Sequence, residues 1–192
     1  MLVDSLSNTG IPCRYQWMRF HHFFSLPVLL IARIMRLSET VSSAPDVAMS
    51  YHNFYRSRSI SVLYRCTLLI DTVIFTIIKV YIPLFVGKYV MICDRFVYDT
   101  LVDLMISTGD TGVLQSTTGT LMLNLVPQNA KTIILMADEE TLRHRRRDLM
   151  HDRNLHQKIM YYQKMHESHG IPIINTSMSV RDVHDRILQE LQ

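Results

Sequence analysis

The triplet Asp94-Arg95-Phe96 follows an apolar run, and its two charged residues are of types that suit chemistry on phosphates. An aspartate at the end of a strand can bind Mg²⁺ or accept a proton from a hydroxyl group, and an adjacent arginine can grip a phosphate through its guanidinium group. An ordinary salt bridge at a strand end would also account for one Asp-Arg pair. The triplet therefore leaves two alternatives open, a phosphate site and a structural ion pair.

A second charged group, Arg143-His-Arg-Arg-Arg147, holds four arginines in five positions. They cannot all lie on one face of a helix, so some must reach outward. Such arginines could close over a polyphosphate and stabilise the charge that develops on a transferring phosphoryl group. The alternatives are a solvated basic face and a nucleic-acid patch. The nearby carboxylates that would neutralise the cluster are those of Glu139, Glu140, Asp148 and Asp152.

Short apolar runs are predicted to be the strands that position these residues. Three of them are Lys88–Asp94, Thr132–Ala137 and Ile171–Thr176, and polar or charged residues stand at or just after their ends. Continuous apolar strands that alternate with helices are typical of a parallel sheet covered on both faces. Ligands of such sheets bind beyond the carboxyl ends of the strands. A further strand, predicted at Ile11–Phe20, brings Arg19 to the same edge.

The remaining pattern predicts helices between these strands, so the expected fold class is α/β. A short helix ends at about Leu6, and Gly10 stands where a left-handed residue would terminate it. The longest predicted helix runs from about Ser59 to Phe85. The other expected helices are 26–40, 98–107, 121–125, one that opens at 139–140, one around 161–162, and 179–191 with Ser179 as N-cap. The two expected loops are 42–53 and 108–120.

Length and composition restrict the class of protein. The 192 residues are enough for one domain with a full core, and the net charge of +3 is too small to indicate nucleic-acid binding by itself. Cys13, Cys66 and Cys93 are far apart and show no zinc or disulfide pattern, which favours three buried thiols in a reducing compartment. The first ten residues lack the pattern of a secretory signal. These features predict a cytoplasmic protein.

The stretch Ile60–Val86 is apolar enough to suggest a membrane segment. Arg65, Asp71 and Lys79 lie within it, and each would cost about 2.5–3.5 kcal/mol near the centre of a bilayer. A buried helix of an α/β protein therefore fits the stretch better, with the charges at its rim or at a site. A membrane-associated protein that uses this segment is the minority interpretation.

The stretch Val86–Thr100 resembles thymidylate kinases and their relatives, which carry a glycine, an apolar strand and then Asp-Arg-Tyr/His. The segments further along are similar to this family in their order: an acidic turn after a strand, an arginine-rich lid, a helix with Tyr161-Tyr162, a glycine, a last strand and a closing helix. The resemblance covers most of residues 10–190. It implies one thymidylate-kinase-like domain over 1–192, with a three-layer parallel sheet of the P-loop kinase type flanked by helices.

The resemblance implies an enzyme, a nucleoside monophosphate kinase that transfers the γ-phosphoryl group of ATP, with Mg²⁺, to dTMP or a related deoxynucleoside monophosphate. Arg95 would hold the phosphate of the acceptor, and Asp94 would help to organise Mg²⁺ or the acceptor. Phe96 and Tyr98 would line the acceptor pocket. Arg19 lies where these kinases often place another arginine that faces the phosphate.

The resemblance also implies a lid, an adenine-binding loop and a dimer. Arg65, the only arginine of the long helix, is a further substrate-binding candidate. The family often has an arginine where Asp71-Thr72 stands here, so the resemblance does not determine which nucleotide base the acceptor carries. Relatives are commonly homodimers through the long helix, here 59–85, and no nucleic acid or membrane partner is expected. The arginines of Arg143–Arg147 would supply the lid, with Arg143, Arg146 and Arg147 as the catalytic candidates, and the residues near the adenine would be Asn175, Thr176 and Ser177.

The sequence lacks one motif that such a kinase requires. G-x-x-x-x-G-K-[ST] is a loop whose backbone N–H groups cradle phosphates ahead of a helix, and none of the six glycines is followed by this pattern. We therefore expect that the first strand, the phosphate loop and most of the first helix are missing, roughly 20–25 residues. A misassigned start, a fragment or a degenerate copy would each produce this.

In the family's sheet the missing strand is central, between the strands that end here at Asp94 and Ala137. These two strands must close up, or leave unpaired backbone that costs stability. The chain as written is expected to be nearly inactive as a kinase. The alternative is a non-catalytic nucleotide-binding relative that has lost its phosphate loop.

Overall fold

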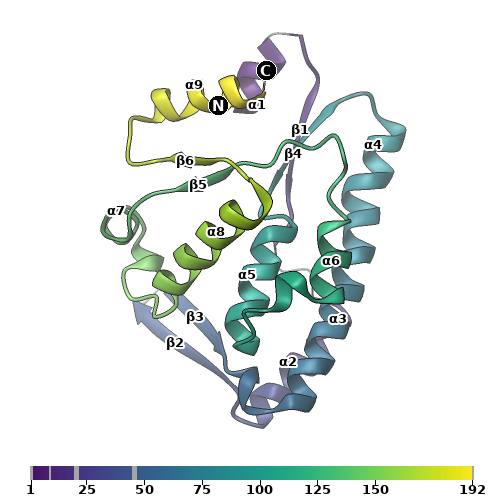
Figure 1. Ribbon diagram of the computed structural model, residues 1–192, viewed down its shortest axis with the longest axis vertical. Coiled ribbons are helices and arrows are strands. Elements are labelled where there is room, and N and C mark those ends of the chain that lie inside the picture. The colour runs from purple at the N-terminus through teal and green to yellow at the C-terminus, as the bar shows by residue number, and fades with distance from the viewer. Residues whose placement is uncertain (1, 9, 20–21, 45–46, 192) are drawn as a thin grey trace. The chain divides into compact units, whose positions relative to one another are not determined.

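The computed structural model describes residues 2–8, 10–19, 22–44 and 47–191 (Figure 1). It is a mixed α/β structure with short parallel strand pairs, so the α/β class predicted from the sequence is confirmed. The chain divides into two compact units. Unit 1 consists of Met1–Glu39 and His52–Pro127, and unit 2 consists of Thr40–Tyr51 and Gln128–Gln192.

Strands β1 (Cys13–Trp17) and β4 (Val90–Asp94) form the sheet of unit 1. They are parallel, in register from Cys13 opposite Val90 to Trp17 opposite Asp94. Both strands therefore end at one edge, as predicted. The prediction that these strands are buried on both faces was wrong: β4 is exposed at its ends and half-buried between them, because its sheet has only one other strand among the described residues.

Helices make up most of unit 1. They are α1 (Leu2–Asn8), α2 (Ser25–Ile34), α3 (Arg58–Thr76), α4 (Ile82–Val86), α5 (Val97–Thr108) and α6 (Thr117–Leu123), with 3₁₀ turns at Phe54–Arg56 and Val113–Gln115. A π turn at Ile77–Tyr81 joins α3 to α4, so the predicted long helix is confirmed as Arg58–Val86. The expectation that this helix is buried was wrong, because only 17% of its apolar 18-residue window is buried in the structure. The core of the unit includes the fully buried side chains of Leu101, Leu104 and Met122.

Asp71 of α3 connects two helices of unit 1. Its side chain is buried and accepts hydrogen bonds from the backbone N–H groups of Phe23 (3.1 Å), Phe24 (2.8 Å) and Ser25 (2.9 Å). The hydroxyl of Ser25 donates a further bond to it at 2.6 Å. These bonds satisfy the N–H groups at the start of α2, which otherwise lack partners within the helix. The charge of Asp71 therefore serves the packing of α2 on α3.

Unit 2 contains a second parallel pair, β5 (Ile134–Met136) and β6 (Ile173–Asn175), with Ile134 opposite Ile173. Its helices are α7 (Glu139–Arg145), α8 (Leu155–His169) and α9 (Val180–Leu191), with a 3₁₀ turn at Arg147–Leu149. The predicted N-cap of α9 is confirmed, because the Ser179 hydroxyl accepts a hydrogen bond from the N–H of Asp182 at 3.2 Å.

Two predicted segments differ from the structure in the region before the long helix. The helix expected over 26–40 ends at Ile34, because Arg36 adopts a left-handed backbone with φ +57° and the chain then enters β2 (Ser38–Ala44). The loop expected over 42–53 is instead β3 (Val47–His52) and the end of β2, which pair with each other. Pro45 of that predicted loop lies outside the described residues.

Two further boundaries differ. The loop expected over 108–120 contains most of α6, which starts at Thr117 because the Ser116 hydroxyl accepts a hydrogen bond from the N–H of Gly119 (3.2 Å) and caps the helix. The strand expected over Ile11–Phe20 is confirmed only for β1, and Phe20 lies outside the described residues.

The described strands form three two-stranded sheets, β1–β4, β2–β3 and β5–β6, instead of one parallel sheet. The strands that end near Asp94 and Ala137 were expected either to pair with each other or to leave backbone groups unpaired. The structure has the second arrangement within the described residues, since β4 and β5 belong to separate sheets. Successive residues of a strand turn their backbone groups to opposite sides, and the N–H of Val90 bonds to the carbonyl of Pro12 beside β1. Met91 and Cys93 therefore turn their N–H and C=O groups away from β1.

Candidate functional site

The edge at which β1 and β4 end carries two of the arginines singled out in the sequence. Arg19 lies two residues beyond β1, and Arg95 directly follows β4. The N–H of Met18 donates a hydrogen bond to the carbonyl of Asp94 at 2.9 Å, so the two chain segments are still side by side at this point. Arg19 and Arg95 thus leave neighbouring parallel strands at one edge, which is where α/β proteins bind their ligands.

Asp94 closes β4 and is exposed at this edge. Its Oδ2 accepts a hydrogen bond from Tyr15 Oη at 2.9 Å. This bond to a carboxylate raises the pKa of the Tyr15 hydroxyl above its ordinary value of 10.0. Tyr15 therefore orients Asp94, a role that sequence analysis missed because it depends on the register between two strands far apart in the chain.

Arg95 has an unusual backbone conformation. Its φ is +60°, in the left-handed region, which costs a residue with a Cβ roughly 1–2 kcal/mol. Strain of this kind is concentrated at functional sites. It turns the chain from β4 into α5, and it lets Arg95 Nη1 donate a hydrogen bond to Asp99 Oδ1 at 2.8 Å. Both side chains are partly exposed, 30% for Arg95 and 19% for Asp99.

Helix α5 presents a second carboxylate to the same edge. Arg19 Nη2 lies 3.4 Å from Asp103 Oδ2, and Asp103 is one helical turn beyond Asp99. Two arginines of the strand ends thus pair with two aspartates of one helix. Sequence analysis did not single out Asp99 or Asp103, although their spacing of four residues in a predicted helix was a usable signal.

Phe96 and Tyr98 flank the start of α5, and both are half-buried. Phe96 stands at the N-cap position and its side chain does not cap the helix. The first N–H groups of a helix and its dipole together favour an anion at this end. A phosphate at this position would meet the start of α5 and the guanidinium group of Arg95 together.

Arg65 lies elsewhere in unit 1. Its Nη2 donates a hydrogen bond to Asp110 Oδ2 at 2.6 Å, and this bond lowers the pKa of Asp110. Asp110 follows the carboxyl end of α5, whereas Arg95 precedes its amino end. The twelve residues of α5 span about 18 Å. The structure therefore does not bring Arg65 to the edge where Arg19 and Arg95 lie.

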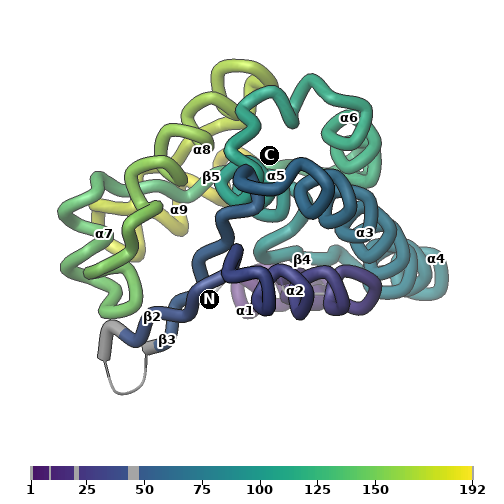
Figure 2. Tube along the Cα trace, turned by 90° about the horizontal axis from the view of Figure 1, so that it is seen from below, coloured from purple at the N-terminus to yellow at the C-terminus, as the bar shows by residue number. Residues whose placement is uncertain are grey.

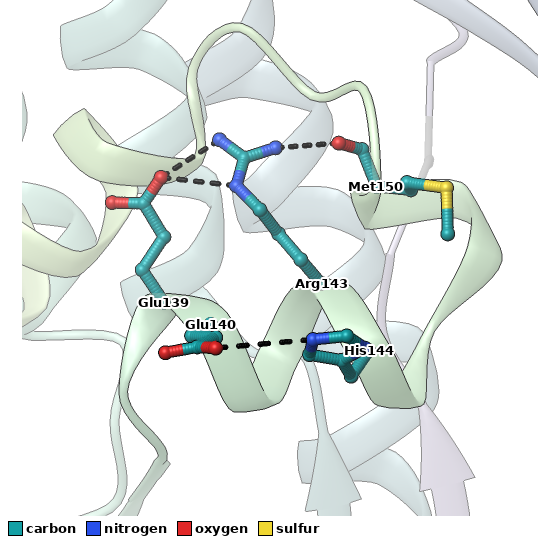
Figure 3. A pocket seen from close by; sticks show the side chains of 5 residues that line it. All are labelled: Glu139, Glu140, Arg143, His144 and Met150. Carbon is teal, nitrogen blue, oxygen red and sulfur yellow. Dashed lines mark hydrogen bonds and ion pairs between the residues drawn. The ribbon is translucent and has the colours of Figure 1, made fainter.

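In unit 2, Arg143 forms part of the wall of an open pocket of about 390 Å³ (Figure 3). It donates hydrogen bonds to Glu139 Oε1 through Nε (3.0 Å) and Nη2 (2.7 Å), and these bonds lower the pKa of Glu139. Its Nη1 donates to the carbonyls of Leu149 (3.1 Å) and Met150 (2.7 Å). Arg143 thus fixes the turn after α7. The pocket is lined by Glu139, Glu140, Arg143, His144 and Met150.

The other arginines of the cluster have different surroundings. Arg145 donates hydrogen bonds to the backbone carbonyls of residues 176–177, in the loop predicted to lie near adenine. Arg146 Nε donates to Asp148 Oδ1 at 3.1 Å. Arg147 is exposed. The arginine that contacts the predicted adenine loop is therefore Arg145, which belongs to the predicted lid segment but was not among its three catalytic candidates.

Asp138 ties this loop to the start of α7. Its carboxylate accepts hydrogen bonds from the N–H (2.8 Å) and hydroxyl (2.7 Å) of Thr141 and from the Ser177 hydroxyl (3.0 Å). These bonds lower the pKa of Asp138 to about 2. The N–H of Ser177 donates to Asn175 Oδ1 at 2.8 Å, and the N–H of Thr176 donates to the carbonyl of Met136 at 2.7 Å.

The described residues do not form a cradle for the triphosphate of ATP, because none of the six glycines lies between a strand and a following helix. Within the described ranges, no group of three or more His, Cys, Asp or Glu side chains is placed to hold a metal ion, although Asp94 has the carboxylate that Mg²⁺ prefers. The glycines are Gly10, Gly109 and Gly170 after helices, Gly87 between α4 and β4, Gly112 after α5, and Gly119 within α6.

No family model matches the chain, and no match is found among curated proteins. The fold and the geometry together define an α/β protein with a candidate anion site at the carboxyl edge of a parallel strand pair. The membership in the thymidylate kinase family stays a prediction from the sequence.

Proposed function

We propose that the protein is of the thymidylate kinase type and binds a deoxynucleoside monophosphate such as dTMP at the edge formed by β1 and β4. The observation that carries the proposal is that Arg19 and Arg95 leave neighbouring parallel strands at one edge, with Arg95 in a left-handed backbone beside the start of α5. Two guanidinium groups and a helix N-terminus are a suitable set of donors for a phosphate.

The incoming phosphate would replace Asp99 and Asp103 as the partner of the two arginines. Ion pairs with this degree of exposure contribute about 0–1 kcal/mol, so replacing them by a ligand costs little free energy. A phosphate accepts paired hydrogen bonds from a guanidinium group and binds it more strongly than one carboxylate oxygen does. The two aspartates would thus hold the arginines in place while the site is empty of nucleotide.

The proposal assigns the base and sugar to the side of Phe96 and Tyr98, which stand next to Arg95. By the resemblance, the lid arginines of the cluster and the loop 175–177 are the residues proposed to serve ATP. Transfer of the γ-phosphoryl group of ATP to the bound monophosphate is the reaction proposed from the resemblance. Because the sequence has no G-x-x-x-x-G-K-[ST], we propose that the chain as written forms ADP at close to the background rate.

Titration calorimetry of the full chain tests the binding proposal. The ligands are dTMP, dAMP, dCMP and dGMP, with thymidine as the matched ligand that lacks the phosphate. We expect at least one monophosphate to bind in the micromolar range, and thymidine to bind at least tenfold more weakly than dTMP, because bonds to a charged group are lost. Equal binding of dTMP and thymidine, or no binding of any monophosphate, refutes the proposal.

A second candidate function, a non-catalytic nucleotide-binding relative, is favoured by the lack of a phosphate cradle among the described residues. The two candidates differ in one measurement, the release of ADP from ATP·Mg²⁺ in the presence of the monophosphate that binds, made on a form of the chain with a G-x-x-x-x-G-K-[ST] segment restored before residue 1, because the chain as written is expected to form ADP at the background rate in either case. ADP release that depends on Arg95 supports the kinase. Binding of the monophosphate without ADP release supports the non-catalytic relative.

A further inference from the structure

Two histidines of unit 1, His22 and His52, stand at the two ends of a row of packed rings. The ring centre of His22 lies 6.5 Å from that of Tyr64, which in turn lies 4.7 Å from that of Phe54. The ring of Phe54 is stacked on that of His52, with 5.1 Å between their centres. Phe54 and Tyr64 are buried, and the two histidines are half-buried. The row thus sets two groups that can take up protons near neutral pH against an apolar core.

His22 is bonded to the start of α2, which lies beside α3 (Figure 2). Its Nδ1 lies 2.8 Å from Oγ of Ser25, and the hydroxyl of Ser25 donates its single proton to Asp71. Oγ of Ser25 can therefore only accept a hydrogen bond from His22, so in the neutral ring Nδ1 carries the proton and Nε2 does not. The next proton that binds to this ring goes to Nε2 and gives the ring a full positive charge.

His52 ends β3 and is bonded to the neighbouring strand β2. Its Nδ1 lies 2.8 Å from Oγ of Ser38, the first residue of β2. Beside this bond, the N–H of Asn53 donates a hydrogen bond to the carbonyl of Leu37 at 2.7 Å. The first part of unit 1 ends at Glu39 and its second part begins at His52. His52 therefore holds together the two chain segments at the base of the β2–β3 pair.

Burial makes the charged form of both rings unfavourable. It lowers the pKa of His22 below the ordinary value of 6.5, although the carboxylates of Asp71 and Asp103 act on this ring and favour its charge. It also lowers the pKa of His52, and a charge on His22 lowers that pKa further. Burial raises the pKa of the Tyr64 hydroxyl above its ordinary value of 10.0, so this neighbour stays neutral. The two rings therefore oppose each other's protonation.

The two carboxylates that act on His22 have other partners. Asp71 accepts hydrogen bonds from the N–H groups at the start of α2, and Asp103 pairs with Arg19 at 3.4 Å. A movement of Asp71 toward a charged His22 would leave the N–H groups of α2 without this partner. A proton on His22 also places a second cation beside the carboxylate that holds Arg19. Protonation therefore disturbs the start of α2 or the ion pair at the strand ends.

We propose that His22 and His52 form an acid-sensitive latch, which holds the start of α2 and the base of the β2–β3 pair together while both rings are neutral and releases them when the rings take up protons. Release follows because two imidazolium groups repel each other and each is better solvated in water. The opened chain binds protons more readily than the closed one, so the latch is at full strength above pH 6.5 and weakens as the pH falls below this value. The proposal does not depend on nucleotide binding and is tested without a ligand.

NMR titration of the histidine rings in the full chain is the first test. We expect both rings to titrate with midpoints below 6.5. His22→Asn should raise the midpoint of His52, because the neighbouring charge is removed while an amide N–H can still reach Ser25. His151→Asn is the matched control, because His151 is exposed and belongs to unit 2, and it should leave the midpoint of His52 unchanged.

Hydrogen exchange at pH 7.5 and pH 5.5 measures the release itself. After correction for the intrinsic effect of pH on exchange, the opening equilibrium constant of segments 22–26 and 36–39 should rise about tenfold at the lower pH, because the open form binds protons that the closed form excludes. Helix α6 is the internal control and should show no such rise. In the double variant with His22→Asn and His52→Asn, the rise should be less than about twofold.

Three outcomes overturn the proposal. A midpoint at or above 6.5 for either ring shows that burial does not hold that ring neutral, and this measurement uses the unaltered chain, so it stands even where a variant does not fold. An unchanged midpoint of His52 in His22→Asn shows that the two rings do not act on each other. An equal rise of exchange in the double variant, or in α6, shows that acid opens the chain from another place.

Discussion

Arg95 in unit 1 directly follows β4, Arg143 in unit 2 lies in the helix that follows β5, and both pair with a carboxylate four positions away. They are held in different ways. Arg95 bonds to the side chain of Asp99 from a left-handed backbone. Arg143 bonds to Glu139 and, in addition, to backbone carbonyls that include that of Met150.

The difference between the two sets of partners indicates which arginine is suited to bind a ligand. A ligand can replace a side-chain carboxylate as a partner, because the aspartate then returns to water. A ligand that replaced backbone carbonyls would leave the turn after α7 without its support. Arg95 is therefore suited to exchange its partner, and Arg143 is suited to hold the fold of unit 2, although both belong to the motifs that the sequence singled out for phosphate chemistry.

The largest expected effect is on ligand binding at Arg95. Arg95→Met should weaken binding of dTMP about 100-fold, because charged hydrogen bonds to the phosphate contribute about 1.5–3 kcal/mol. The free energy of unfolding should change by less than about 1 kcal/mol, since the pair with Asp99 is partly exposed. Calorimetry and urea unfolding measure the two quantities. Arg181→Met, on the exposed side of α9, is the control. An unchanged Kd for dTMP in Arg95→Met would contradict the conclusion that Arg95 exchanges its partner for a ligand.

The reverse result is expected at Arg143. Arg143→Met should lower the free energy of unfolding by about 1–2 kcal/mol, since its 33% exposed side chain makes bonds that water replaces only in part. It should leave the Kd for dTMP unchanged. Arg147→Met, in the same cluster but exposed, should change stability by less than about 0.5 kcal/mol. Equal losses for the two variants would show that Arg143 does not support the turn.

A smaller effect is expected when the partner of Arg95 is changed. Asp99→Asn should strengthen binding of dTMP about threefold. The substitution removes the ion pair that competes for Arg95, which contributes about 0.2–1 kcal/mol, and it removes the repulsion between the Asp99 carboxylate and the phosphate. The same titration measures it, with Asp185→Asn on α9 as the control. Weaker binding would mean that Asp99 positions Arg95, and that its partner is not simply exchanged for a ligand.

The smallest effect concerns the loop held by Asp138. Thr141→Val removes one of its hydrogen bonds and should raise the pKa of Asp138 from about 2 toward its ordinary value of 3.8. Since this pKa is lowered by folding, the bonds stabilise the protein fully above pH 3.8 and are lost as the pH falls toward 2. NMR titration of the carboxyl group measures the change. Thr118→Val in α6 should leave it unaltered, and an unmoved value in Thr141→Val would assign the shift to the backbone N–H of Thr141 and the Ser177 hydroxyl.

The sequence predicted those features of the fold that depend on local pattern. The apolar run that ends at Asp94, the helix that follows it and the long helix are all confirmed, because each follows from apolar spacing and from residues that begin or end an element. The β2–β3 pair was missed, since its polar residues form strands only through pairing with each other. The burial of β4 was predicted too high, because burial depends on neighbouring strands.

The part of the candidate site that depends on the order of the elements was also predictable from the sequence. Arg19 and Arg95 meet at one edge because parallel strands end together, which the order of the elements implies. Tyr15 and Asp103 were not found, and Arg145 was not singled out within its cluster, because each acquires its role from a partner on another element. Arg65 was predicted to bind substrate, but it bonds to Asp110 beyond the carboxyl end of α5, and this pairing could not be read from the sequence either.

The edge of β4 that carries Met91 and Cys93 has a consequence for preparing this protein. Extended backbone whose donors and acceptors have no strand partner among the described residues can add strands from other chains in solution. The yield of refolding should therefore fall as the concentration of protein rises, with intermolecular β-structure in the aggregates. Refolding at high dilution, or with a short apolar peptide in excess as a removable cover for this edge, should keep the molecules apart.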